Sequence, residues 1–223
     1  MYHIARNILL AVLLLQHLCT PVAASERSQF PGKVVVVDPG HGGHYDGAVQ
    51  NGVREADVNL TVSLKLQREL AAMGFKVVLT RNSDVTVAPP GVPLSSDLQA
   101  RVDIANSVDA DIFISLHANS DPGDQNNSGI ICFYGAGRPD ALASAIQHSL
   151  VQETKAADGG IRPANFYVLR NSKIPAVLVE MGFLTNNREA RLLTENAYQD
   201  TIVTGIGKGI TNYFLSRSFV DKE

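Results

Sequence analysis

The sequence predicts one three-layer α/β domain, in which helices flank a mostly parallel central sheet. Short apolar and β-branched runs alternate with longer segments whose apolar residues recur at helical spacing. The leading run is apolar on both faces, which is typical of a buried parallel strand. The chain has 223 residues, of which 45% are hydrophobic and 18% are charged. This composition excludes a disordered chain, and the length is sufficient for a sizeable core.

The predicted strands are short runs rich in Val, Ile, Leu and Phe, bounded by residues that favour turns. They cover residues 33–37, 75–80, 112–116, 129–134, 166–169 and 176–179. Residues 39–53 are rich in glycine, residues 82–95 are rich in proline and residues 118–128 are polar. We therefore expect these three segments to be loops.

The predicted helices cover residues 55–73, about 96–107, 139–153, 186–193 and 198–214. Several of their ends carry signals for capping or for starting a helix. These signals are Gly74 after the first helix, Ser96 or Asp97 at the start of the second, Pro139 at the start of the third, and Asn186 followed by Glu189.

The first 24 residues are predicted to be a secretory signal peptide. Arg6 gives a positive start, residues 8–15 are apolar, and Ala24 ends a run of small residues suited to cleavage. A membrane anchor is disfavoured because crossing a bilayer takes about 20 apolar residues, and a lipid on Cys19 is a second alternative. We expect an exported protein, periplasmic or secreted, without a membrane span after cleavage. A short lead (25–32), one domain (33–217) and a tail (218–223) would remain.

Charge and cysteine content narrow the possible functions further. The formal net charge of −3 disfavours nucleic-acid binding, which needs a positive excess. Cleavage after residue 24 would leave Cys132 as the single cysteine of the mature chain, which excludes an internal disulfide. Cys132 lies in an apolar run, so we expect a buried small hydrophobe rather than a nucleophile.

The candidate chemistry lies where predicted strands end. His41 follows the first strand, His117 follows the third, and Glu180 follows the last. Ligands of open α/β sheets bind outside the carboxyl ends of the strands, and Glu55 begins the helix after the glycine-rich loop. Two histidines and a carboxylate suit a catalytic Zn²⁺ with an open position for water. A further carboxylate must then move the proton, and Glu180 is the natural base.

Each of these residues also has an ordinary structural explanation. His41 could be a turn residue, His117 a core histidine and Glu55 an acid that favours a helix N-terminus. An unpaired Glu180 at a buried strand end would be costly, which already favours a functional role. The convergence of all of them at one sheet edge makes the catalytic interpretation the stronger one.

Other residues near this edge have less certain roles. Asp38 either orients a ligand histidine or caps a turn, and Asn119 is a candidate substrate contact. We expect Arg81 to be structural, with substrate binding as the alternative. His44 is expected to be a solvated loop residue or a substrate contact rather than a ligand.

The motifs together resemble one known family. Asp-Pro-Gly-His-Gly-Gly at 38–43, Glu55, Ser-Leu-His-Ala-Asn at 115–119 and Val-Glu-Met-Gly-Phe-Leu-Thr-Asn at 179–186 look like those of the zinc-dependent N-acetylmuramoyl-L-alanine amidases of amidase 3 type. The resemblance covers about residues 33–215. It implies a central sheet of six strands, one Zn²⁺ held by His41, Glu55 and His117, and Glu180 as catalytic carboxylate. It also implies hydrolysis of the amide between N-acetylmuramic acid and L-alanine in peptidoglycan.

The resemblance also raises the question of whether the protein needs an activator protein. Some members carry an extra helix between the fourth strand and the following helix, which blocks the zinc site until an activator binds. Here only residues 135–138 separate Tyr134 from Pro139. We therefore expect an unblocked monomeric enzyme without an obligate activator, whose partner is its peptidoglycan substrate.

Two other functions stay open from the sequence alone. The same ligands would serve a zinc peptidase that cuts within the stem peptide. A non-catalytic wall-binding module could share the fold, although the intact set of four residues argues against it.

Overall fold

The computed structural model describes residues 29–220, with side chains described up to Arg217. The expected signal peptide (1–24) and the first half of the expected lead (25–32) lie outside the described residues. The expected tail (218–223) overlaps the last helix, which ends at Val220. Within the described part of the chain, no helix combines the length and apolarity that crossing a membrane requires.

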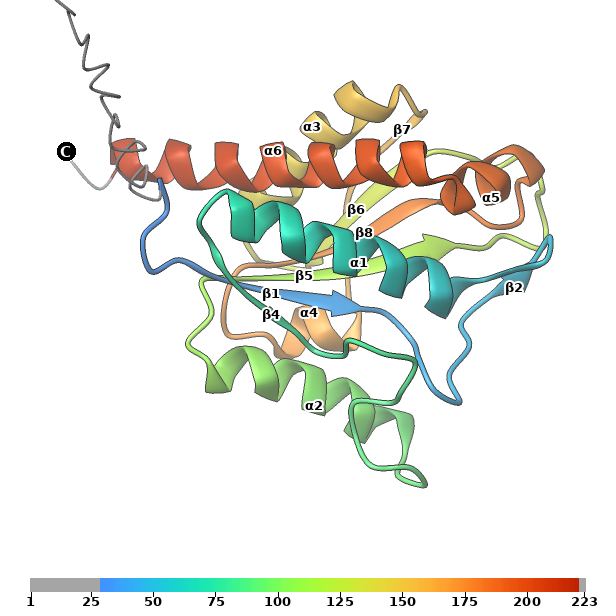
Figure 1. The fold of residues 1–223 in the computed structure, drawn as a ribbon, viewed down its shortest axis with the longest axis horizontal. Helices are drawn as coiled ribbons and strands as arrows, with labels where there is room; N and C mark the ends of the chain where they lie inside the picture. The colour runs from blue at the N-terminus through green and yellow to red at the C-terminus, as the bar shows by residue number, and fades with distance from the viewer. Residues whose placement is uncertain (1–28, 221–223) are drawn as a thin grey trace, which may run out of the picture.

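A six-stranded sheet with the order β4-β1-β5-β8-β6-β7 forms the centre of the molecule (Figure 1). Its strands are β1 (Val34–Pro39), β4 (Lys76–Leu79), β5 (Ile112–Asn119), β6 (Ile130–Gly135), β7 (Asp158–Ala164) and β8 (Ala176–Phe183). Neighbouring strands run parallel, except that β6 pairs antiparallel with β8. The predicted α/β class, its mostly parallel sheet and the six strands are confirmed.

Helices cover both faces of this sheet. They are α1 (Glu55–Ala72), α2 (Leu94–Ser107), α3 (Ala141–Thr154), α4 (Tyr167–Asn171), α5 (Asn187–Thr194) and α6 (Asn196–Val220). In Figure 1, α1, α3 and α6 lie on one side of the sheet, and α2 and α4 lie on the other. This arrangement is the predicted three-layer architecture.

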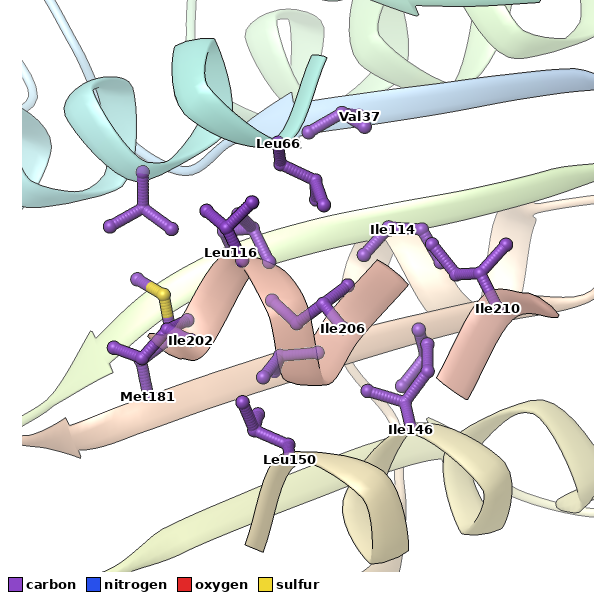
Figure 2. Close-up of a cluster of buried hydrophobic side chains, with 14 of the residues drawn as sticks. Val37, Leu66, Ile114, Leu116, Ile146, Leu150, Met181, Ile202, Ile206 and Ile210 are labelled. Atoms are coloured by element: carbon purple, nitrogen blue, oxygen red, sulfur yellow. The ribbon is translucent and has the colours of Figure 1, made fainter. Parts of the chain in front are cut away.

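The first four residues of β1, Val34 to Val37, are all apolar because both faces of the strand are buried. Its side chains alternate between the two faces of the sheet. Val35 and Val37 belong to the larger core cluster under α1, α3 and α6, whereas Val34 and Val36 belong to the cluster under α2 and α4. Figure 2 shows part of the larger cluster, with side chains from three helices and from β1, β5 and β8.

The prediction of a strand at 166–169 was wrong. Residues from Tyr167 onward form the short helix α4, and Phe166 precedes it in an extended conformation. A short apolar run does not distinguish a strand from one helical turn. Here Val168 and Leu169 are part of the helix α4, and their side chains are buried in the smaller core cluster.

Strand β7 was missed because its sequence, Asp-Gly-Gly-Ile-Arg-Pro-Ala, resembles a turn. Glycine and proline weaken or interrupt a central strand, but proline is tolerated at the edge of a sheet. β7 is the last strand in the order and pairs only with β6 within the described sheet. The edge position explains how this sequence forms a strand. The expected loop at 39–53 likewise contains a small hairpin of β2 (Val49–Gln50) and β3 (Val53–Arg54).

The predicted helix ends were partly correct. Asn186 caps α5 as predicted, because its side chain accepts hydrogen bonds from the amides of Arg188 and Glu189. Neither Ser96 nor Asp97 caps α2, which begins at Leu94. The Asp97 carboxylate instead accepts hydrogen bonds from the amides of Val87 and Ala88 in the preceding loop.

Candidate active site

Three side chains from three separate elements converge at the carboxyl edge of the sheet. His41 lies in the loop after β1, Glu55 is the first residue of α1, and His117 lies near the end of β5. Glu55 Oε1 lies 3.2 Å from His41 Nε2 and 2.9 Å from His117 Nδ1. One ligand atom from each of the three residues lies within 4.8 Å of the others. The sequence-predicted ligand set is therefore a spatial cluster.

The glycine-rich loop brings His41 to this position through an unusual backbone. His41 has φ of 62°, in the left-handed region that side chains rarely adopt, and Gly42 follows with φ of 120°. A Cβ on Gly40 would overlap the His117 ring, with Cδ2 only 2.8 Å away. Residue 40 therefore has to be glycine for the loop to pack against His117.

Main-chain groups hold the Glu55 carboxylate in one orientation. Its Oε2 accepts a hydrogen bond from the amide of Ala48 at 2.9 Å, and its Oε1 accepts one from Ala118 at 3.2 Å. The pairing of β5 with β8 shifts register between His117 and Asn119. Such an irregularity takes a residue out of the sheet ladder, which explains why Ala118 can donate to Glu55.

Glu55 stays ionised despite its burial. Burial alone would raise the pKa of its carboxyl group, but the hydrogen bonds from His117 and His41 outweigh it and hold the pKa well below its usual range. A permanently charged carboxylate with its Oε1 facing two imidazole nitrogens is an electrostatically favourable ligand for a cation.

Glu180 lies on β8, paired in register with His117 on β5. The residue as a whole is partly exposed, yet its Oε2 is fully buried and has no hydrogen-bond partner among the described residues. Burial, and then the charge of Glu55, raise the pKa of Glu180 to about 8. A carboxyl group with this pKa can both accept and release a proton near neutral pH.

The three converging residues fit a zinc ion. Two imidazole nitrogens and one carboxylate oxygen are a common donor set of catalytic zinc, which keeps a further position open for water or substrate. Zinc also suits this set better than copper(I), which prefers thiolate or thioether ligands. The unpartnered Oε2 of Glu180 at the same sheet edge is explained by a polar group that binds there.

Asp38, for which the sequence left open orientation of a ligand histidine or capping of a turn, lies in a buried network of side chains. Its buried carboxylate accepts hydrogen bonds from Thr80 at 2.6 Å, Ser115 at 2.7 Å and Arg101 at 2.8 Å. These described partners include no histidine ring, so direct orientation of a ligand histidine is not observed. Burial alone would raise the pKa of Asp38, but the Arg101 charge and these hydrogen bonds lower it below its usual range.

Arg101 was missed in the sequence and connects this carboxylate to the metal-ligand loop. Its guanidinium is buried and also donates to the carbonyl oxygens of Pro39 and His41, each at 2.9 Å. A second carboxylate, Asp97, accepts from its Nε at 3.0 Å. The available signal was an Asp and an Arg four residues apart on a helix that also carries core residues. Arg101 thus fixes the backbone on which His41 stands.

The remaining candidates are mostly structural. Arg81 donates to the carbonyl oxygens of Pro39, Gly40 and Ala56, as the structural interpretation predicted. Cys132 is fully buried, and burial raises the pKa of its thiol far above the range of a nucleophile. Asn119 accepts a hydrogen bond from the amide of Ser120.

A cavity of about 600 Å³ opens over the candidate ligands. His41, His44, His117 and Glu180 are among its lining residues. The apolar wall of the cavity is formed by Leu94, Leu98, Phe166, Tyr167, Val168 and Leu178. Asn119 is absent from the lining residues, whereas His44 remains placed for substrate contact. A substrate in the cavity would therefore meet both the polar cluster and the apolar wall.

Comparison with known proteins supports the resemblance seen in the sequence. The family model described as N-acetylmuramoyl-L-alanine amidase matches residues 35–212. A germination-specific N-acetylmuramoyl-L-alanine amidase of Bacillus subtilis is 35% identical over 83% of this chain and 81% of its own length. The N-acetylmuramoyl-L-alanine amidase LytC of the same species is 34% identical over 87% of this chain, which spans only 38% of LytC.

Solved structures share the fold. The catalytic domain of CwlV, an amidase from Paenibacillus polymyxa, has a TM-score of 0.74 at 35% identity, with 82% of this chain and 98% of that chain covered. The amidase CwlD of Clostridioides difficile, solved in complex with the GerS lipoprotein, has a TM-score of 0.78 at 31% identity, with 82% and 99% covered. From its sequence and its fold, the chain belongs to the N-acetylmuramoyl-L-alanine amidase family.

Proposed function

We propose that this protein hydrolyses the amide bond between N-acetylmuramic acid and L-alanine in peptidoglycan, with one zinc ion per chain. The observation that carries the proposal is the cluster of His41, Glu55 and His117 beside the unpartnered carboxylate oxygen of Glu180. Membership of the amidase family supports the substrate class. Relatives named as cell-wall amidases support an exported location, periplasmic or secreted.

His41, Glu55 and His117 would hold the zinc ion. When bound, zinc supplies Lewis acidity toward the substrate carbonyl and makes water a stronger nucleophile near neutral pH. Glu55 contributes the negative charge of the ligand set, and its carboxylate is fixed by the amides of Ala48 and Ala118. The two neutral imidazoles leave the set with one net negative charge.

Glu180 moves the proton in this proposal. Its carboxylate accepts a proton from the attacking water and then returns it to the nitrogen of the departing alanine. A cation held by the three ligands would lower the pKa of Glu180 from about 8 and would so favour the ionised form that the first step needs. The apolar wall around Phe166 would face the non-reacting part of the substrate and exclude water from it.

The protein is proposed to act as a monomer without an obligate activator. Strand β6 ends at Gly135 and α3 begins at Ala141, so the connection between them is too short for a blocking helix. The relative CwlD was solved with a lipoprotein partner, so this point needs its own test. Purified protein that stayed inert on peptidoglycan until a second protein was added would contradict it.

Mass spectrometry of digested peptidoglycan tests the reaction. In the presence of zinc, the protein should release stem peptides that begin with L-alanine and leave peptide-free glycan. Fragments cut within the stem peptide would instead identify a zinc peptidase. Bound zinc without any product would indicate either a missing activator or a wall-binding module. Glu180→Ala should keep zinc and abolish hydrolysis, so surviving activity would exclude Glu180 as the base.

A further inference from the structure

The amide side chain of Asn59 contacts two parts of the candidate metal centre. Asn59 lies on α1, one helical turn after Glu55, and is fully buried. Its Nδ2 lies 3.2 Å from the carbonyl oxygen of Gly40, the residue before His41. The same nitrogen lies 3.4 Å from Oε1 of Glu55. One side chain thus links the backbone of the His41 loop to the Glu55 carboxylate.

The chemistry of the two neighbours fixes the orientation of this amide. A carbonyl oxygen and a carboxylate oxygen are both acceptors, so only the amide nitrogen can face them. Oε1 is the oxygen of Glu55 that also faces His41 and His117. Asn59 therefore donates to the carboxylate oxygen on the side of the proposed metal.

The other end of the amide shows that this position is not optimised for stability. Asn59 Oδ1 is buried and has no hydrogen-bond partner among the described residues, and Ser63 Oγ, one turn further along α1, is in the same condition. A buried acceptor without a partner disfavours the folded state, whereas leucine would fill a similar volume without that cost. The donor function of Nδ2 explains why an amide occupies a fully buried position.

We propose that Asn59 is a positioning residue, which holds the Glu55 carboxylate and the His41 loop in the arrangement that binds zinc. Its two hydrogen bonds restrain two of the three ligands relative to each other before the metal arrives. Without them, Glu55 would keep its bonds from Ala48 and Ala118, and Arg81 would still join Gly40 to Ala56 on α1. The direct link between the Glu55 carboxylate and the His41 loop would be lost, so the ligand set would be less ordered before zinc binds. Partners of this kind typically change metal affinity by about 10–100-fold.

The test measures zinc affinity by competition with a chromophoric chelator, on protein first stripped with EDTA. Asn59→Leu removes both hydrogen bonds at similar volume, and Asn59→Asp places an acceptor against two acceptors. Both variants should bind zinc at least tenfold more weakly than the unchanged protein. Ser63→Ala is the matched control, because Ser63 is equally buried on the same helix and its hydroxyl hydrogen-bonds to neither ligand. The zinc affinity of this variant should stay within twofold of the unchanged protein.

A second measurement needs no variant and covers the case in which the Asn59 variants do not fold. In NMR spectra of the unchanged protein, the side-chain amide resonances of Asn59 should shift when zinc is added. Gln147, whose buried amide donates to Ile130 and Asp158 away from the ligands, provides the control resonance. Unmoved Asn59 resonances in the presence of bound zinc would overturn the inference.

The outcomes separate this inference from the proposed function on which it rests. If the unchanged protein binds no zinc, the proposed metal centre is wrong and the role of Asn59 falls with it. If the unchanged protein binds zinc and folded Asn59 variants bind it within threefold of that affinity, the metal centre stands and the positioning role is wrong. A loss of thermal stability without a loss of zinc affinity would also assign Asn59 a purely structural role.

Discussion

Replacing the proposed catalytic carboxylate should stabilise the metal-free protein. Burial and the neighbouring Glu55 raise the pKa of Glu180 from 4.5 to about 8 in the folded state. A carboxyl group with a raised folded-state pKa contributes stability that is complete below the unfolded pKa and is lost as the pH rises through the folded one. Glu180 therefore disfavours folding increasingly between about pH 4.5 and pH 8. Glu180→Gln removes this ionisation and keeps the shape of the side chain.

The pKa sets the size of the effect. At roughly 1.4 kcal/mol for each pH unit, the rise from 4.5 to about 8 gives an upper limit of about 5 kcal/mol at pH 8. The residue is partly exposed and its surroundings can relax, so we expect about half of this limit. At pH 5 the two proteins should differ by less than about 1 kcal/mol, because this pH lies only half a unit above the unfolded-state pKa of 4.5.

Urea unfolding in EDTA at pH 5 and pH 8 measures the difference in the free energy of unfolding. Glu195→Gln, a change at a half-exposed carboxylate, is the control and should show no comparable gain. Saturating zinc should reduce the advantage of Glu180→Gln, because a nearby cation favours the ionised carboxylate. Equal stability of Glu180→Gln and the unchanged protein at pH 8 in EDTA would refute the idea that Glu180 is held in a desolvated site.

Three further predictions concern the metal centre and its support. Gly40→Ala should weaken zinc binding at least tenfold in a chelator competition, because its Cβ would displace His117; Gly123→Ala, where the nearest atom is 3.3 Å away, should bind normally. Arg101→Met should lower the free energy of urea unfolding by about 3–5 kcal/mol by leaving buried Asp38 unpaired, and a loss below 1 kcal/mol would contradict the buried ion pair. Zinc at a thousandfold excess over its Kd should stabilise the unchanged protein by about 4 kcal/mol. Thermal unfolding with and without EDTA tests this, and the same unfolding temperature in both would contradict it.

Much of the fold was predictable because its central strands are buried on both faces. The apolar runs that became β1, β5 and β8 could be identified without any partner in view. β7 could not, because what makes Gly-Gly-Ile-Arg-Pro a strand is its position at the edge beside β6. The error at Phe166 has the same origin, since burial of Val168 and Leu169 against α2 selects a helical turn.

The candidate site likewise contains residues that the sequence could predict and residues that it could not. His41, Glu55, His117 and Glu180 were predictable because each stands at the end or start of a predicted element. Their supports were not, because contacts such as the one between Arg101 and Asp38 join residues 63 positions apart. A sequence shows which side chains can do chemistry at an edge, but the residues that restrain them are defined by packing between elements.

Residues with an unfavourable backbone or an unpartnered buried polar atom can indicate where a protein functions. His41 adopts a left-handed backbone, Glu180 buries an oxygen without a partner, and Asn59 does the same on the neighbouring helix. Each departure costs stability, and all three belong to or contact the cluster at one sheet edge. Natural sequences tolerate such costs chiefly where a site requires them. Similar departures occur on other helices, such as the unpartnered oxygens of Gln147 and Gln199. The meeting of three of them around Glu55 nevertheless supports a functional centre independently of any family resemblance.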